Sequence, residues 1–151
     1  MQFHKIIASC CGLGYIPKGS GTFAALFYIL VWIGVISTTG NSFCKEQIFV
    51  FFLISVAGVI SSNKVEKVWG KDSKKVVIDE LAGMALSLLC FPPKWYYAVM
   101  AFVLFRFFDI AKPFYIKQTE KLPGGWGVMM DDWIAALYAN LVLHGIAVFL
   151  K

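Results

Sequence analysis

The sequence predicts an all-α fold, an integral-membrane helical bundle with about four to five membrane-embedded helices. Hydrophobic residues make up 59% of the 151-residue chain, and the mean hydropathy is +0.71. Charged residues make up only 15%, whereas roughly 25% is usual for soluble domains. So few charges could not cover the surface of a soluble domain of this length. The length itself suits a single domain, residues 1–151.

Two long stretches without charge predict the first two membrane spans. Residues 23–37 follow a glycine-rich segment, and with their flanks they approach the roughly 20 residues that a spanning helix needs. Ser20 or Thr22 is a suitable N-cap for this helix. Residues 47–63 are again apolar and free of charge, and predict a second span. The lysine-rich residues 63–75 predict a solvated loop or surface helix.

Two shorter apolar segments, residues 81–93 and 95–105, predict a hairpin that is either tilted across the membrane or re-entrant. Neither reaches spanning length without including charged neighbours. Two prolines at the end of the first segment make a sharp turn between them. Residues 133–150 predict the last span.

The basic residues predict how the bundle is oriented. If the N-terminus is cytoplasmic and all five segments cross, only Lys45, Lys94 and Lys151 of the 14 basic residues lie outside. This bias matches the positive-inside rule. The net charge of +5 then reflects attraction to anionic membrane lipids. We expect no nucleic-acid partner, because the chain has no basic stripe and no nucleic-acid-binding motif.

The four cysteines show no pattern that indicates a metal site. None forms a C-x-x-C pair, and none has a nearby histidine at zinc-ligand spacing. We therefore expect small apolar filler side chains at Cys10, Cys11, Cys44 and Cys90.

Five of the nine acidic residues lie where apolar segments begin or end. Acidic residues at a helix start also stabilise the helix dipole, by about 0.3–1 kcal/mol, so one such pair indicates little. Two vicinal pairs and a fifth carboxylate on one membrane face repel one another unless a cation holds them. Hard oxygen ligands suit Mg²⁺. The sequence therefore predicts a Mg²⁺ site on the cytoplasmic face, formed by Asp79, Glu80, Asp109, Asp131 and Asp132.

Basic and small residues complete the predicted site. Arg106 and Asp109 are three residues apart and share a helix face, so one interpretation is a plain ion pair at the interface. The other is that Arg106 and Lys112 bind phosphate oxygens beside the metal. Catalytic roles are thus predicted for Asp79, Asp109, Asp131, Asp132, Arg106 and Lys112. Substrate binding is predicted for Arg106, Lys112, Thr22 at a helix N-terminus, and Gly124 and Gly125, although an ordinary flexible loop has a similar glycine content.

Four motifs, in the same order, resemble those of the phosphatidylglycerophosphatase A family. Residues 12–22 resemble its G-x-G-x-x-P-x-x-P-G-T block, and residues 77–84 its V-x-D-E-x-x-G-M block. Residues 105–113 resemble its F-R-x-x-D-x-x-K-P block, and residues 124–132 its G-G-x-G-x-M-x-D-D block. Proline is replaced by Ser20 in the first block and by Tyr115 after the third, and Ala24-Ala25 replace a common Gly-Ser. Every charged residue of the motifs is kept.

This resemblance implies a Mg²⁺-dependent phosphatase of phospholipid biosynthesis. The implied reaction converts phosphatidylglycerophosphate to phosphatidylglycerol and inorganic phosphate. It implies a helical protein of the bacterial inner membrane, and the apolar segments and the distribution of basic residues predict that this protein is multi-pass with its active site facing the cytoplasm. We expect water to attack the terminal phosphate, with electrostatic stabilisation supplying most of the catalysis. A covalent aspartyl-phosphate is the alternative.

Two other classes of protein fit parts of this pattern. A small ion-binding or transport membrane protein would use the same carboxylate cluster, but would place it in the middle of the membrane. A non-catalytic assembly factor would tolerate loss of the carboxylates. The position of the carboxylates at segment ends, beside a lysine-rich region, favours the enzyme.

Overall fold

The computed structural model describes residues 1–39, 44–71, 73–113, 116–119 and 121–149. Tyr115 and the end of the predicted last span lie outside these residues. In chain order the elements are α1 (Gln2–Ala8), the 3₁₀ helix η1 (Leu13–Tyr15), α2 (Ser20–Thr39), α3 (Cys44–Trp69), α4 (Ile78–Ser87), α5 (Trp95–Ala111), α6 (Ile116–Thr119) and α7 (Gly125–Phe149). No strand occurs in the described part of the chain, which confirms the predicted all-α class.

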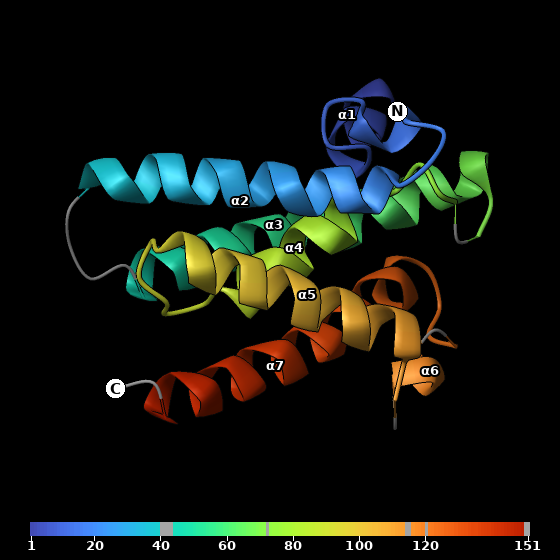
Figure 1. The fold of residues 1–151 in the computed structure, drawn as a ribbon. Coiled ribbons are helices and arrows are strands. Elements are labelled where there is room, and N and C mark those ends of the chain that lie inside the picture. The colour runs from blue at the N-terminus through green and yellow to red at the C-terminus, as the bar shows by residue number, and fades with distance from the viewer. Residues whose placement is uncertain (40–43, 72, 114–115, 120, 150–151) are drawn as a thin grey trace.

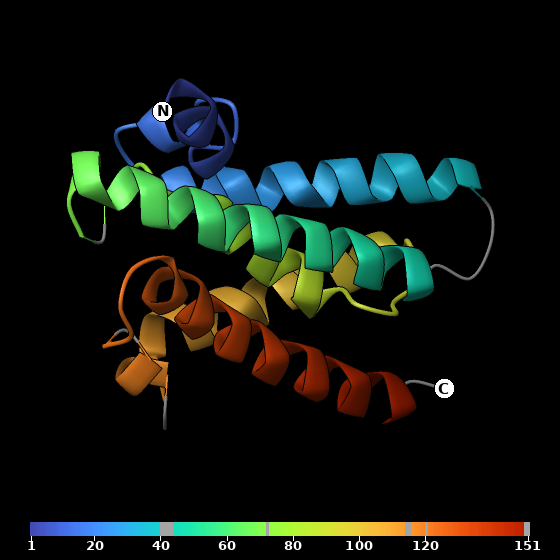
Figure 2. The ribbon, with the colours of Figure 1, turned by 180° about the vertical axis from the view of Figure 1, so that it is seen from behind.

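The short helix α4 lies at the centre of the bundle. It packs on α2, α3, α5 and α7, and α5 also packs on α7 (Figures 1 and 2). Alanines line the buried faces of α7 and α5, for example Ala135, Ala139 and Ala101, around the larger core side chains Met84 and Phe105. Small residues at helix contacts let the backbones approach closely. The core therefore runs along α4 and ends where α4 begins, at the acidic residues.

The observed helix ends differ from the predicted segments in two places. α3 continues through most of the lysine-rich region and ends at Trp69, because Val65 is buried and keeps one face of this extension packed. The predicted hairpin is unequal, since α4 has 10 residues and α5 has 17. Its first half is therefore much too short to span a membrane as a helix.

Two helices in the described residues, α3 and α7, are long and apolar enough to cross a membrane, and α2 contributes a shorter apolar segment, Ser20–Val35. Large apolar side chains also point outward from α2, α3, α5 and α7, including Leu30, Phe52, Ile110 and Leu141. Extensive exposed apolar surface marks a membrane or a partner. The fold therefore supports membrane association, and the number of four to five embedded helices stays a prediction.

A disulfide between Cys44 and Cys90 links the start of α3 to the turn that follows α4, at one end of the bundle. The prediction of four filler cysteines is wrong for this pair. The two cysteines are 46 positions apart in the sequence, and only the packing of α3 on α4 brings them together. The Gln47 side chain binds the same turn, because its Oε1 accepts from the Cys90 N–H and its Nε2 donates to the Phe91 carbonyl at 3.2 Å. Cys10 and Cys11 are free thiols.

Candidate active site

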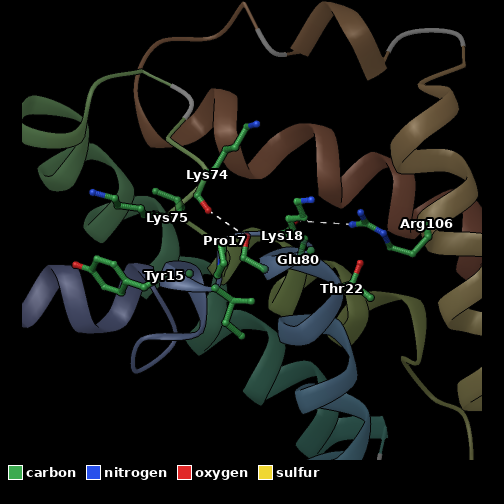
Figure 3. A pocket seen from close by; sticks show the side chains of 14 residues that line it. Tyr15, Pro17, Lys18, Thr22, Lys74, Lys75, Glu80 and Arg106 are labelled. Atoms are coloured by element: carbon green, nitrogen blue, oxygen red, sulfur yellow. Dashed lines mark hydrogen bonds and ion pairs between the residues drawn. The ribbon is translucent and has the colours of Figure 1, made fainter.

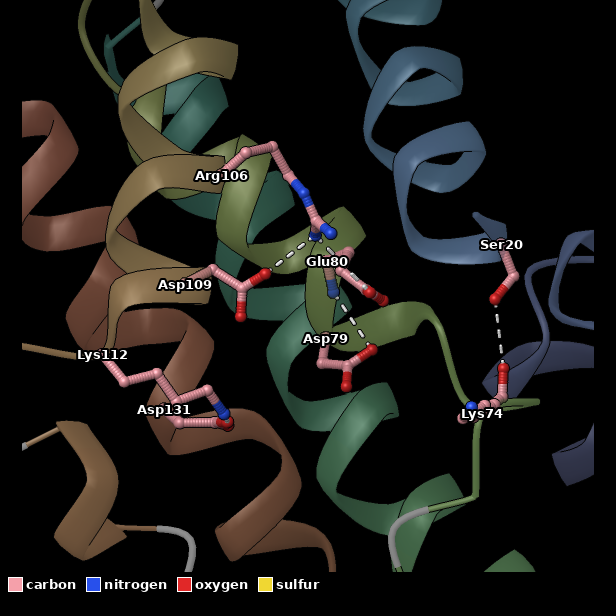
Figure 4. A network of polar contacts seen from close by, with 8 residues as sticks. All are labelled: Ser20, Lys74, Asp79, Glu80, Arg106, Asp109, Lys112 and Asp131. Carbon is pink, nitrogen blue, oxygen red and sulfur yellow. Dashed lines mark hydrogen bonds and ion pairs between the residues drawn. The ribbon is translucent and has the colours of Figure 1, made fainter. Parts of the chain in front are cut away.

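The structure brings the predicted charged residues together at the end of the bundle opposite the disulfide. Two of them lie in the first turn of α4, three come from the last two turns of α5 and the residue after it, and two lie near the start of α7. These helix ends meet at one side in Figures 1 and 2. The residues gathered there are Asp79, Glu80, Arg106, Asp109, Lys112, Asp131 and Asp132, and Figure 4 shows all of them except Asp132.

The backbone at the end of α5 places one of the cations. Lys112 has a left-handed conformation with φ 42° and ψ 52°, which is uncommon for a residue other than glycine. Its N–H donates to the Phe108 carbonyl at 2.9 Å, and Pro113 follows directly and cannot continue the helix. The Lys112 side chain thus leaves the helix end toward α7, where its Nζ lies 2.9 Å from Asp131 Oδ2.

Three of the five carboxylates form a compact group. One oxygen each of Asp79, Glu80 and Asp132 lies within 4.8 Å of the others. Asp132 is only 4% exposed, and Asp79 Oδ1 accepts from the Glu80 N–H at 3.1 Å. Vicinal acidic residues on α4 thus face an acidic residue of α7 across a packed helix contact.

Unsatisfied oxygens in this group indicate that it can hold a cation. Glu80 Oε2 and Asp132 Oδ2 are buried and have no hydrogen-bond partner in the described part of the chain. A buried polar group without a partner is costly, and a carboxylate more so. Three converging carboxylates, two of which have an oxygen without a partner in the described residues, fit a hard divalent cation such as Mg²⁺.

Burial also raises the pKa of the two acidic residues that begin α4. The pKa of Asp79 lies well above its ordinary value, first because the carboxyl is buried and then because Glu80 and Asp132 are close. Burial raises the pKa of Glu80 as well, while its hydrogen bond with Asp79 and the Arg106 guanidinium lower it in part. Without a cation the group therefore retains protons more strongly than isolated carboxyls do.

The other two carboxylates each hold a cation of the chain. Arg106 Nη1 lies 2.9 Å from Asp109 Oδ2, the ion pair that the three-residue spacing allowed, and 3.8 Å from Glu80 Oε1. Asp131 Oδ2 holds Lys112 in the same way. Asp109 and Asp131 thus orient positive charge beside the carboxylate group (Figure 4).

Glycines allow the close contacts that surround the site. A Cβ on Gly21, in the first turn of α2, would collide with the Glu80 carboxylate. On the other side, the Gly125 N–H donates to Asn63 Oδ1 at 2.6 Å, and a Cβ on Gly124 would collide with the same side chain. The structure thus gives the glycine pair a packing role on α3, and their predicted role in substrate binding stays a prediction.

A pocket of about 560 Å³ adjoins the carboxylates. Thr22 lines it together with Glu80 and Arg106, and Figure 3 shows these three side chains near one another, while the phosphate-binding role of Thr22 stays a prediction. Its remaining wall contains Lys18, Lys74 and Lys75, and these lysines were not among the predicted site residues. No motif in the sequence pointed to them, because only the tertiary fold brings residues 74–76 against residues 14–22.

An all-helical chain with outward apolar faces, and with carboxylates and cations gathered at one end, has the features of a membrane-associated phosphatase. A sequence model of phosphatidylglycerophosphatase A matches residues 6–147. The chain belongs to this family, and it is a phosphatase.

Curated relatives cover most of the chain. A Bacteroides thetaiotaomicron protein with the provisional name phosphatidylinositol-3-phosphatase is 37% identical over 144 residues, which are 91% of this chain and 89% of that protein. Phosphatidylglycerophosphatase A of Haemophilus influenzae is 35% identical over 146 residues, 93% of this chain and 86% of the relative. The Escherichia coli phosphatidylglycerophosphatase A is 30% identical over 144 residues, 92% and 80% respectively. No solved structure matches the chain.

Proposed function

We propose that this protein hydrolyses the terminal phosphate of phosphatidylglycerophosphate, giving phosphatidylglycerol and inorganic phosphate, in a Mg²⁺-dependent reaction. The observation that carries the proposal is the group of Asp79, Glu80 and Asp132 beside the oriented cations Arg106 and Lys112. Carboxylates that hold a cation, flanked by basic side chains, are suited to a phosphate monoester. The whole chain, residues 1–151, acts as one domain in this proposal.

The three grouped carboxylates are the proposed Mg²⁺ ligands. The unsatisfied oxygens of Glu80 and Asp132 and the raised pKa values of Asp79 and Glu80 fit a site that a divalent cation completes. When bound, Mg²⁺ supplies positive charge that offsets the negative charge developing on the phosphoryl oxygens.

Two basic residues bind the phosphate, and a fourth carboxylate accepts a proton during the reaction. Arg106 and Lys112, positioned by Asp109 and Asp131, bind the phosphoryl oxygens and stabilise the transition state electrostatically. Water attacks phosphorus, the bond to the glycerol oxygen breaks, and that oxygen leaves with a proton. Asp131 Oδ1 is our candidate for the group that accepts the proton of the attacking water, because it is buried and has no hydrogen-bond partner in the described residues.

A second substrate deserves a direct comparison because of one relative. The Bacteroides thetaiotaomicron protein carries the name of a phosphatase for a different lipid phosphomonoester. We favour phosphatidylglycerophosphate, because the family match and the two other relatives carry its name. Phosphatidylinositol 3-phosphate is the second candidate.

Phosphate release in detergent micelles tests both substrates. Purified protein is given each lipid with Mg²⁺, with EDTA, and with EDTA followed by excess Mg²⁺. We expect release from phosphatidylglycerophosphate that stops with EDTA and returns with Mg²⁺. Faster phosphate release from phosphatidylinositol 3-phosphate would make that lipid the preferred substrate. Phosphate release that persists in EDTA would show that the reaction does not depend on Mg²⁺.

We also propose that the active site faces the cytoplasm and that α2, α3, α5 and α7 are embedded in the inner membrane. The disulfide at the opposite end supports this orientation, since disulfides persist in the oxidising periplasm and are rare in the cytoplasm. Cys11, a free and exposed thiol, follows shortly after α1, which lies at the site end (Figure 1). A membrane-impermeant maleimide should therefore label Lys94→Cys in intact cells and leave Cys11 unlabelled until the membrane is permeabilised. Labelling of Cys11 in intact cells would reverse the orientation.

A further inference from the structure

The pocket beside the carboxylates has two walls that the fold holds firmly together. A Cβ on Gly14 would collide with the Lys75 carbonyl, so the two segments are in close backbone contact. Ser20 Oγ donates to the Lys74 carbonyl at 3.2 Å, and the Val77 N–H donates to the Ala8 carbonyl at 2.9 Å. A pocket of about 560 Å³ lies in the size range of ligand sites. It is thus formed before any ligand binds.

The pocket is strongly basic. Lys18, Lys74, Lys75 and Arg106 line it, and Glu80 is the one acidic residue among the lining residues described. Lys18 and Lys74 are exposed, and neither has an ion pair with a carboxylate in the described parts of the chain. Their charge is therefore available to an anionic ligand.

Two further features favour an anion at this position. The ammonium of Lys75 lies 5.6 Å from the ring centre of Tyr15 and 5.7 Å from that of Trp69, so aromatic contacts fix one cation in the wall. The first turn of the 20-residue helix α2, with Gly21 and Thr22, also lines the pocket. The first N–H groups of a helix have no partner within the helix and attract negative charge.

The geometry relates this pocket directly to the proposed reaction centre. Glu80 and Arg106 belong to both, whereas Lys74, Lys75 and Tyr15 lie on the side away from Arg106, and Lys18 lies between them beside Glu80 (Figure 3). A ligand that places one phosphate at the carboxylates can therefore extend a second anionic group among the lysines.

We propose that this pocket binds the second phosphate of the substrate, the phosphodiester that joins the head group to the diacylglycerol. The inference rests on the proposed function and assigns residues to one part of that substrate, the internal phosphodiester, which a short polyol separates from the terminal phosphomonoester. Lys18 and Lys74 bind the phosphodiester, and their contribution is to substrate affinity. The chemical step remains with the carboxylates, Arg106 and Lys112.

The test compares two pairs of exposed lysines. Lys18→Ala with Lys74→Ala removes the free cations of the pocket, and Lys64→Ala with Lys67→Ala removes the same charge from α3 outside it. Lys75 is left in place because its substitution would disturb two aromatic contacts. Hydrolysis of phosphatidylglycerophosphate is measured in neutral detergent micelles, so that the substrate is the sole anionic lipid and attraction to surrounding lipid contributes nothing.

We expect the pocket pair to raise KM by about tenfold or more with kcat unchanged, since each lost charge-assisted contact weakens binding. The control pair should leave both constants unchanged, and Lys18→Arg with Lys74→Arg should restore KM. An unchanged KM in the pocket pair, or an equal rise in the control pair, would overturn the proposal. A fall in kcat at constant KM would overturn it too, because the lysines would then act on the chemical step.

Equilibrium binding of short-chain phosphatidylglycerol separates failure of this inference from failure of the proposed function. This lipid has the phosphodiester and no terminal phosphate, so its binding requires no turnover. The pocket pair should bind it about tenfold or more weakly than the wild type, even if the wild type proves inactive on phosphatidylglycerophosphate. Equal binding by the wild type and the pocket pair would exclude the phosphodiester site whatever the reaction is.

Discussion

The two ends of the bundle differ in how fully their polar groups are paired. At the disulfide end, Gln47 satisfies both the Cys90 N–H and the Phe91 carbonyl, and Asn140 Nδ2 donates to the Ser87 and Leu89 carbonyls at 3.1 Å each. At the carboxylate end, acidic groups crowd together and some of their oxygens have no partner in the described residues. The disulfide and the paired polar groups at one end stabilise the fold. At the other end, buried carboxylate oxygens without partners destabilise the fold until a ligand binds them.

The largest effect should come from breaking the carboxylate group. Asp132→Asn keeps the shape of the side chain and removes a charge from the proposed metal site. We expect phosphate release to fall by about 100- to 1,000-fold, as for loss of a central electrostatic group in other enzymes. Glu46→Gln, an equivalent change on α3 at the disulfide end, should leave the rate unchanged.

Near-normal hydrolysis by properly inserted Asp132→Asn, and likewise by Asp79→Asn and Asp109→Asn, would contradict the proposed site. Such a result would favour an ion-binding protein or an assembly factor.

A smaller loss of activity is expected from a substitution that displaces a carboxylate of the site without removing it. Gly21→Ala puts a methyl group where the Glu80 carboxylate lies, and this displaces the carboxylate from Asp79 and Asp132. We expect about a tenfold loss of phosphate release, since small misplacements at an active site are costly. The control is Gly34→Ala on the same helix, where a Cβ meets nothing within 4 Å. Equal activity of the two variants would show that the Glu80 position is unimportant.

The disulfide end should show the reverse pattern. Cys44→Ser with Cys90→Ser should lower the free energy of unfolding by about 2–4 kcal/mol and leave kcat unchanged below the unfolding transition. Thermal unfolding in detergent measures the first effect and phosphate release the second. Cys10→Ser with Cys11→Ser, which removes the two free thiols, should not change the stability. A disulfide variant that unfolds like the wild type but loses activity would contradict this division between the ends.

The subtlest effect is on the pH dependence of stability. Because the raised pKa of Asp79 means that the folded state binds its proton more tightly, metal-free stability should fall as pH rises from about 4 through that raised value. Mg²⁺ competes with the proton, so it should raise the Tm more at about pH 8 than at about pH 5.5. A Mg²⁺-induced shift that is equal at both values would mean that the cation binds elsewhere.

Sequence patterns predicted the features that depend on local order. The charge-free stretches predicted helices, and the positions of Asp79, Asp109 and Asp132 at segment ends placed them at one face. The spacing of Arg106 and Asp109 anticipated their ion pair, because residues three apart on a helix are neighbours.

Features that depend on packing between distant segments could not be predicted. Lys112 and Asp131 come from different helices, and so do Cys44 and Cys90. The division of the carboxylates into a group of three and two cation partners also depends on how α4, α5 and α7 meet. The pocket beside the carboxylates forms only when residues 74–76 pack against residues 14–22, and no motif in the sequence predicts that contact.

Direct measurement of metal binding tests the central claim that Asp79, Glu80 and Asp132 hold the cation, while Asp131 serves the reaction. Isothermal titration of Mg²⁺ is carried out on the wild type, Asp132→Asn and Asp131→Asn in neutral detergent. We expect binding by the wild type, binding about 10- to 100-fold weaker in Asp132→Asn, and nearly unchanged binding in Asp131→Asn despite its loss of phosphate release. Wild-type affinity in Asp132→Asn, or loss of binding in Asp131→Asn alone, would contradict this assignment of the site.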